Sequence, residues 1–368
     1  MKDNRLRNHI PLGGPATREP VRGDEPALRV SLGFMPSWYY RRLGIDFSQQ
    51  WHSDPIYRYE ALLRMKTHLH SSFPEVPDFA PQYNDRGIEP TCATLSGVFG
   101  IKLIPMLYGL GTQYFRDGWP DNTPGACLPK EALWSLEPFD IASLPAIAEL
   151  ERQMDILEET YGAIHGYLNY QGILNNALKL RGNEIFLDMV DDPDFAHHLF
   201  VHIADTMQRA AEHVQARQRK SGFEVNLLSV SNCVMNMISP QMYENFVMPL
   251  DNMLSRKFAR FGVHTCNWTI DPYIGCLSNI EKMGYIDMGM GSDMAKVRRA
   301  FPDARRAVLY SPVDLVQKDL GMIDNDLALI QEALAPCDIV MADITADTPD
   351  ERVRAFLALA DRRSKGMK

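Results

Sequence analysis

Short apolar runs alternate along this chain with longer amphipathic stretches, a pattern typical of α/β proteins. The apolar runs predict strands over residues 29–34, 98–106, 162–168, 225–230, 262–266, 285–290, 307–311 and 338–342. The amphipathic stretches predict helices over residues 145–161, 193–220, 240–261, 272–284, 324–334 and 349–363. Several of these helices begin with a capping side chain followed by proline, and Gly222, Gly262 and Gly284 stand where three of them end, as helix termini prefer.

The alternation predicts a TIM (β/α)8 barrel, because strands separated by helices across about 330 residues suit this fold, which needs about 250 residues before insertions. A doubly wound open sheet is the competing architecture. It normally carries a glycine-rich phosphate loop after its first strand, and residues 33–36 (Gly-Phe-Met-Pro) do not form one. We therefore expect one catalytic barrel domain over residues 28–368, preceded by a loosely ordered arm over residues 1–27 that is rich in arginine and proline.

The composition restricts the partners of the protein. The net charge of −9 argues against nucleic acid or an anionic membrane surface. The chain has no run of about 18 apolar residues, and residues 1–27 lack the apolar core of a signal peptide. Six cysteines without a Cys-x-x-Cys pair indicate free thiols in a reducing cytoplasm. Among them, Cys92, Cys127 and Cys276 show no pairing pattern and are predicted to be packing residues.

The most informative local pattern is the run His264-Thr265-Cys266-Asn267-Trp268 at the end of an apolar stretch. Residues i and i+2 of a strand point to the same face, so His264 and Cys266 can direct an imidazole and a thiolate to one point. Zinc binds such ligands readily. The pattern therefore predicts a metal site at this strand end, with a buried histidine and cysteine of the core as the alternative.

Barrel enzymes place their active sites at the carboxyl ends of the strands, and polar residues gather at those positions here. We expect Arg41 and Arg42, after the first strand, to bind a substrate carboxylate or phosphate, or else to pair with acidic residues. The other candidates for substrate binding or metal ligation near the strand ends are Asn232, Cys233, Asn267, Trp268, Asp293, Asp314 and Asp343.

Three segments resemble the uroporphyrinogen decarboxylase superfamily. Residues 238–250 (ISPQMYENFVMPL) are similar to the family's SPxxFxxFxxPY helix, and residues 347–356 (DTPDERVRAF) to its terminal PDTPxENVxAF segment. Pro36, Trp38, Arg41 and Gly44 lie in a more divergent counterpart of its PVWxMRQAGRY segment. The resemblance spans roughly residues 30–362 and independently implies a TIM barrel.

The superfamily has two main branches. One removes carboxyl groups from a porphyrinogen without a cofactor, and the other comprises zinc-dependent methyltransferases that move a methyl group between a corrinoid protein and a thiol. His264 and Cys266 match the His-x-Cys of the methyltransferase branch. The resemblance thus implies zinc as the metal, a methylcorrinoid on a partner protein as co-substrate, and a homodimer.

A departure from the family pattern leaves the third zinc ligand open. The family uses a cysteine there, and Ala342 stands at the matching position. We predict Asp343 as the replacement, with Cys233 as the other candidate. Cys337, at the start of the last strand, would lie too far below the mouth of a barrel and is expected in the core.

The decarboxylase branch matches less well. Arg41 corresponds to the first arginine of its substrate-binding pair, but Ile45 stands at the second position. For the aspartate that binds the pyrrole nitrogens, Asp78 lies in the right region, but its context Val-Pro-Asp-Phe does not match the family motif. We therefore expect a metal-dependent methyltransferase with His264, Cys266 and Arg41 as catalytic residues. Two alternatives stay open: a metal-free carboxy-lyase of a tetrapyrrole or other carboxylated aromatic, with His264 as acid or base, and a non-catalytic protein that binds a tetrapyrrole or corrinoid.

Overall fold

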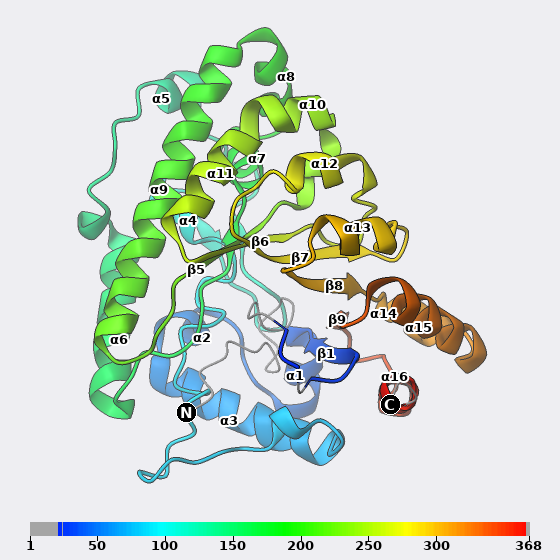
Figure 1. Cartoon of the computed structure of the whole chain (residues 1–368). Helices are drawn as coiled ribbons and strands as arrows, with labels where there is room; N and C mark the ends of the chain where they lie inside the picture. The colour runs from blue at the N-terminus through cyan, green and yellow to red at the C-terminus, as the bar shows by residue number, and fades with distance from the viewer. Residues whose placement is uncertain (1–20, 24, 366–368) are drawn as a thin grey trace.

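The protein is built on a parallel sheet of seven strands covered by helices, which confirms the α/β prediction (Figure 1). The computed structural model describes residues 21–23 and 25–365, so most of the predicted N-terminal arm lies outside the described residues. The strand order is β1-β9-β8-β7-β6-β5-β4, and every neighbouring pair is parallel. The bounds are β1 Leu28–Phe34, β4 Tyr170–Gln171, β5 Leu227–Ser231, β6 Arg260–His264, β7 Met283–Gly289, β8 Arg305–Leu309 and β9 Cys337–Ile344. A separate antiparallel pair joins β2 (Thr112–Gln113) and β3 (Asp121–Asn122).

The first and the last strand of the chain are neighbours in this sheet, because β1 pairs with β9 along its length. Successive strands from β4 to β9 are also neighbours. Such an order is the one that a barrel has. Within the described residues the hydrogen-bonded ladder has β1 and β4 at its two ends, so the order agrees with a barrel while the ladder itself is not a closed ring.

The position between β1 and β4 holds no regular strand in the described chain, and the predicted strand over residues 98–106 is wrong. Residues 103–107 form the short helix α4 (Leu103–Leu107) instead. Gly97, Phe99 and Gly100 all have positive φ angles, which an extended strand excludes. The predicted strand over residues 162–168 contributes one isolated parallel bridge, from His165 to Thr94, which lies outside the seven-stranded sheet.

The close packing of Thr94 next to this bridge leaves no room for a side chain at Gly166. This residue has φ +96°, and a Cβ there would lie 1.9 Å from the Thr94 hydroxyl oxygen. Gly222 is a matched control, because its φ is +93° and a Cβ there meets nothing within 4 Å. We expect Gly166→Ala to lower the free energy of unfolding by about 2–3 kcal/mol more than Gly222→Ala does, measured by urea denaturation. Equal losses in the two variants would show that Thr94 does not pack against this site.

Helices surround the sheet, and two of the predicted ones have the expected bounds. The α-helices are α1 Pro36–Leu43, α2 Gln49–Ser53, α3 Pro55–Ser72, α4 Leu103–Leu107, α5 Lys130–Trp134, α6 Pro145–Tyr161, α7 Ile173–Arg181, α8 Glu184–Asp191, α9 Pro193–Lys220, α10 Pro240–Met242, α11 Met248–Lys257, α12 Ile274–Leu277, α13 Met294–Ala300, α14 Pro312–Gln317, α15 Leu320–Leu334 and α16 Asp350–Lys365. The 3-10 helices are η1 Pro77–Phe79, η2 Ile141–Ser143, η3 Cys233–Met237 and η5 Asp271–Tyr273, and the π-helix is η4 Tyr243–Val247. Helices α6 and α9 confirm the predictions over residues 145–161 and 193–220.

Other predicted helices differ in their bounds. The helix expected over residues 240–261 consists of α10, η4 and α11, and it ends at Lys257 because β6 begins at Arg260. The helix expected over residues 272–284 is reduced to η5 and α12. Gly262 and Gly284 consequently lie inside β6 and β7, not at helix ends, whereas Gly222 follows α9 as expected.

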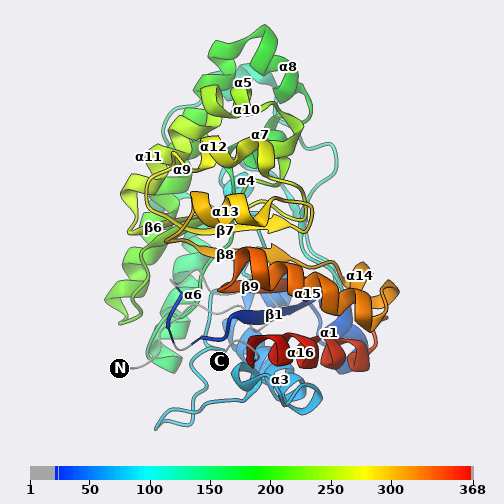
Figure 2. The same cartoon turned by 45° about the vertical axis from the view of Figure 1, so that its right-hand side comes forward.

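The C-terminal helix α16 packs against β1 and is hydrogen-bonded to its first residue. Helices α15 and α16 lie side by side, and α16 also contacts β1 (Figure 2). The Ser364 hydroxyl both accepts a hydrogen bond from the Leu28 amide and donates one to the Leu28 carbonyl, each 3.1 Å long. Of the helices in the described part of the chain, none combines the length and the apolarity that crossing a bilayer requires.

Candidate metal centre

The register of two neighbouring strands brings the candidate site together. Ser231, the last residue of β5, pairs with His264, the last residue of β6. The Asn232 amide then donates a 2.8 Å hydrogen bond to the His264 carbonyl, so the chain leaves β5 directly beside the end of β6. Cys233 follows as the first residue of η3. Residues far apart in the sequence therefore meet at the carboxyl edge of the sheet.

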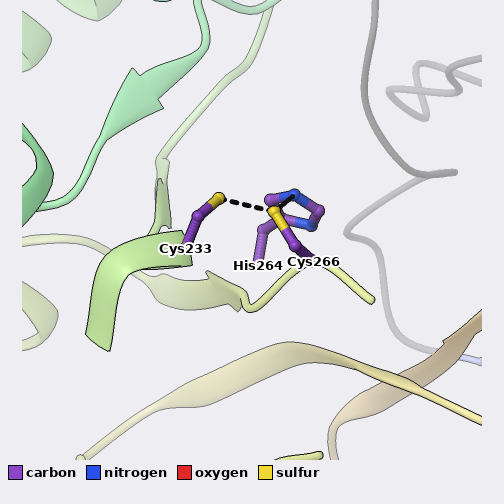
Figure 3. Close-up of side chains that lie close together, drawn as sticks. All are labelled: Cys233, His264 and Cys266. Carbon is purple, nitrogen blue, oxygen red and sulfur yellow. Dashed lines mark hydrogen bonds between the residues drawn. The ribbon is translucent and has the colours of Figure 1, made fainter. Parts of the chain in front are cut away.

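Three side chains with metal-binding atoms converge at this edge. One ligand atom each from Cys233, His264 and Cys266 lies within 4.8 Å of the other two. The two sulfur atoms are 2.6 Å apart, and the Cys266 sulfur lies 3.2 Å from His264 Nε2 (Figure 3). All three residues are partly buried, and both cysteines are free thiols. Of the two candidates for a third ligand, Cys233 is the one that lies in this group.

The convergence of His264 and Cys266 arises in a different way from the one predicted. Strand β6 ends at His264, so strand alternation does not place Cys266. Cys266 has a φ of 62°, in the left-handed region that a residue other than glycine rarely adopts. This turn directs its thiol back toward His264, and Cys266 also packs, with Ala342, against a small apolar cluster on β7, β8 and β9. Such strain is typical of functional sites.

Asp287, in the middle of β7, orients the histidine. Its carboxylate is fully buried and accepts hydrogen bonds from His264 Nδ1 at 2.6 Å, from the Thr265 amide at 2.6 Å and from the Tyr285 hydroxyl at 2.9 Å. Because Nδ1 donates to Asp287, Nε2 is the nitrogen that faces the two thiols. A carboxylate behind a ligating histidine is the usual outer partner of a metal site.

Asp287 is a site residue that was not predicted from the sequence, although the sequence carries a signal for it. The residue is the one acid in the otherwise apolar run Tyr285-Ile286-Asp287-Met288 of a predicted strand. A carboxylate in a buried strand requires a partner, since an unpaired buried charge is costly. That partner lies on the neighbouring strand and is not visible from the sequence of β7.

The electrostatics of the group favour a thiolate at Cys233. Hydrogen bonds from the Cys266 thiol and from His264 lower the pKa of Cys233 to about 5, although burial opposes the change. The same contact with Cys233, together with burial, raises the pKa of Cys266. Burial alone lowers the pKa of His264, but the charge and hydrogen bond of Asp287 outweigh it and raise this pKa to about 10. The proton donors around Cys233 therefore favour its thiolate form over that of Cys266.

The donor set fits a zinc ion. Two thiolate sulfurs and one imidazole nitrogen are soft to borderline ligands, and tetrahedral zinc takes such combinations. Three protein ligands leave the fourth position for water or substrate, as in catalytic zinc sites. Catalytic zinc sites also usually have a carboxylate that holds the non-ligating nitrogen of the histidine, and Asp287 provides it for His264.

Asp343, the predicted third ligand, is exposed and lies outside the group of three. It is nevertheless close, because its charge contributes to the raised pKa of Cys266, and it has a φ of 62°. Although the residue as a whole is exposed, partial desolvation of its carboxyl group raises its pKa, while the charge of His264 opposes this change. Ligation by Asp343 therefore stays a prediction. Cys337 is buried at the start of β9, as expected.

The two arginines after β1 are paired with acids from the segment that follows β9. Arg42 forms a bidentate ion pair with Asp350 (2.7 and 2.8 Å), and its guanidinium lies 4.1 Å from the centre of the Trp38 ring. Arg41 contacts Asp347 at 2.8 Å in a pair that is 58% and 81% exposed. An exposed pair is weak, so Arg41 can exchange its partner for a substrate anion more easily than Arg42 can.

The remaining predicted site residues occupy different environments. Asn232 is buried and Asn267 is exposed. Trp268 is partly buried, and its ring packs edge-on against Tyr273. Its backbone carbonyl accepts a hydrogen bond from the Gly289 amide. Asp293 is exposed and caps α13 by accepting from the Lys296 amide.

Asp314 is in the first turn of α14, where it forms a 3.2 Å ion pair with Lys318. Cys92 and Cys276 are buried, as expected for packing residues, whereas Cys127 is exposed, so that prediction is wrong for Cys127.

Comparison with known proteins identifies the fold. No family model and no curated protein matches the chain. Among solved structures, a methyltransferase from Methanosarcina mazei superposes with a TM-score of 0.63 at 13% sequence identity, covering 93% of this chain and 95% of that one. A Listeria monocytogenes protein described as a vitamin-B12-independent methionine synthase superposes with a TM-score of 0.40 at 12% identity, covering 63% of this chain and 72% of that one. The first likeness shows a shared fold over nearly the whole of both chains.

Proposed function

We propose that this protein is a zinc-dependent methyltransferase that moves a methyl group from a methylcorrinoid to a thiol or similar acceptor. The observation that carries the proposal is the convergence of Cys233, His264 and Cys266, with Asp287 holding the histidine. The shared fold with a protein named as a methyltransferase supports the same reaction class. The ligand set differs from the one predicted, because Cys233 takes the place proposed for Asp343.

The fold and family form part of the same proposal. We propose a (β/α)8 barrel in which residues 93–95 occupy the second strand position, supported by the bridge to His165 and by the pairing of β1 with β9. We also place the chain in the uroporphyrinogen decarboxylase superfamily, on its methyltransferase side. The motifs over residues 238–250 and 347–356 support this assignment.

The protein side chains have separate tasks in this reaction. Cys233, His264 and Cys266 would hold the zinc ion, which lowers the pKa of an acceptor thiol and keeps it as a thiolate at neutral pH. Asp287 keeps the proton on Nδ1 of His264, so that Nε2 is free to bind. The thiolate would supply the nucleophile for the methyl carbon of the methylcorrinoid, and the electron pair of the carbon–cobalt bond would leave with the cobalt as the carbon–sulfur bond forms.

Residues around the ligands would bind the two substrates. Asn267, Trp268 and Asp343 are proposed for the acceptor side, since they adjoin the ligands or influence their charge. Arg41 is proposed as a contact for a substrate anion because its pair with Asp347 is exposed. We propose that the methylcorrinoid is presented by a separate protein and that the enzyme is a homodimer.

A direct assay tests the proposal. Untagged protein loaded with zinc is mixed with methylcobalamin and a thiol under anaerobic reducing conditions, and the spectrum of demethylated cobalamin and the thioether mass are followed. We expect turnover that stops after zinc is removed with a chelator and returns when zinc is restored. Turnover that persists in the chelated protein would contradict a role for the metal. Release of CO2 from a carboxylated tetrapyrrole by metal-free protein would replace the proposal with the carboxy-lyase alternative.

A further inference from the structure

Asn232 joins the two segments that carry the candidate ligands. It directly precedes Cys233 in the chain, and its backbone N–H donates a hydrogen bond to the backbone carbonyl of His264. Its backbone angles (φ −97°, ψ 41°) turn the chain out of β5 and into η3. The direction of the Cys233 side chain therefore depends on how Asn232 is held.

The Asn232 side chain is held by a buried carboxylate, not by the helix that it precedes. The side-chain amide of Asn232 does not cap η3; its Nδ2 instead donates a 3.0 Å hydrogen bond to Asp251 Oδ2. The Tyr243 hydroxyl donates to the same oxygen at 2.7 Å. Asp251 and Tyr243 are completely buried, and Asn232 is 2% exposed, so this contact lies in the interior between β5 and α11.

Burying a carboxylate between a helix and a sheet costs desolvation free energy. Within the described residues, no basic side chain pairs with Asp251, and its second oxygen, Oδ1, has no hydrogen-bond partner. Burial raises the pKa of Asp251 to about 6, against the two hydrogen bonds. Replacing Asp251, Asn232 and Tyr243 together by apolar side chains of similar shape would usually be neutral or stabilising. Packing alone thus does not account for the carboxylate.

The π-helix η4 makes the contact between Tyr243 and Asp251 possible. On a regular α-helix, residues eight positions apart lie about 80° apart around the axis; a π turn absorbs one residue and reduces this to about 20°. Tyr243 begins η4 and Asp251 lies in the first turn of α11, so the irregularity falls between them. Irregular turns of this kind frequently occur next to functional sites.

We propose that Asp251, supported by Tyr243, is a positioning residue for the metal centre: it locks the Asn232 side chain and thereby directs Cys233 toward His264 and Cys266. The inference rests on the proposed function, since it gives Cys233 the role of a ligand. Asp251 acts through Asn232 and does not itself touch the metal or a substrate.

The experiment measures zinc affinity by competition with a chromogenic chelator, and thiolate ligation by the charge-transfer band of the cobalt(II)-substituted protein. Asp251→Leu removes both acceptor contacts and keeps the branching at Cγ, and we expect zinc to bind 10- to 100-fold more weakly, as for other outer partners of metal ligands, with a weaker cobalt band. Tyr243→Phe should have a smaller effect in the same direction. Asp251→Asn keeps an oxygen acceptor and should stay within about 3-fold of the wild type.

Ser255→Ala is the matched control, because Ser255 is also fully buried on α11 but its hydroxyl donates only to Asn252 of the same helix. It should leave both readouts unchanged. Wild-type affinity and an unchanged cobalt band in folded Asp251→Leu and Tyr243→Phe would overturn the inference. So would an Asp251→Asn variant that loses as much affinity as Asp251→Leu.

A separate readout distinguishes this inference from the proposed function. Failure of the wild-type protein to bind zinc or cobalt would refute the proposed function. Iodoacetamide labelling of the metal-free proteins, resolved by peptide mass spectrometry, then decides the inference alone. A changed ratio of Cys233 to Cys266 labelling in Tyr243→Phe and Asp251→Leu, but not in Ser255→Ala, supports positioning of Cys233, and an unchanged ratio overturns it.

Discussion

Cys233→Ser, His264→Ala and Cys266→Ser should each lower the zinc content from about one ion per chain to nearly none after dialysis against a mild chelator. Each substitution removes one of the three donor atoms that lie within 4.8 Å of one another. Two protein ligands hold zinc weakly, because the remaining coordination positions are filled by water. Metal content is measured by mass spectrometry of untagged protein purified under reducing conditions. Methyl transfer should be lost in parallel.

Two controls show whether the loss is specific. Cys127→Ser removes an exposed free thiol and should leave the zinc content unchanged. Asp343→Asn tests the ligand predicted from the sequence: retained zinc supports the Cys233 site, whereas loss of zinc would make Asp343 a ligand as well. Absence of metal from the wild type, even after zinc is added back with a reductant, would refute the metal-dependent reaction.

Asp287→Ala should produce the largest loss of stability, about 3–5 kcal/mol in the free energy of unfolding. The substitution removes the carboxylate that accepts hydrogen bonds from three donors: His264 Nδ1, the Thr265 amide and the Tyr285 hydroxyl. The imidazole also loses the group that selects its tautomer, so we expect a 10- to 100-fold lower zinc affinity. Urea denaturation of the metal-free protein measures the first effect, and chelator competition measures the second.

Tyr285→Phe is the matched control for Asp287. It removes one donor to the same carboxylate and leaves the contacts of His264 and Thr265 in place. We expect a loss of about 1 kcal/mol and a nearly unchanged zinc affinity. A loss below 1 kcal/mol in Asp287→Ala, with zinc affinity retained, would show that the carboxylate neither supports the fold nor orients the histidine.

Local sequence patterns predicted much of the scaffold, because periodicity and capping act over a few residues. The amphipathic periods and Pro starts of α6 and α9 agree with the structure at both ends. The apolar runs of β7, β8 and β9 were also located. The prediction failed over residues 98–106, where Gly97, Phe99 and Gly100 adopt positive φ angles that an apolar composition does not reveal.

Some residues of the candidate site could likewise be predicted from local sequence, and others could not. His264 and Cys266 were recognised because both lie in one short run of sequence, and their chemistry follows from their residue types. The choice between Cys233 and Asp343 could not be made from spacing. It depends on the register of β5 against β6, which brings Ser231 beside His264, and on the turn at Cys266. Asp287 was missed because its partner is on another strand.

The sequence by itself determined the α/β class, most of the strands and long helices, and the imidazole–thiol pair that suggested metal chemistry. The tertiary structure alone decided that Cys233 joins this pair, that Asp287 orients His264 and that Asp251 holds Asn232. The physical reason is distance along the chain. Periodicity and motifs are properties of neighbouring residues, whereas a metal centre is set by hydrogen-bond register and buried contacts between segments that meet only when the sheet forms.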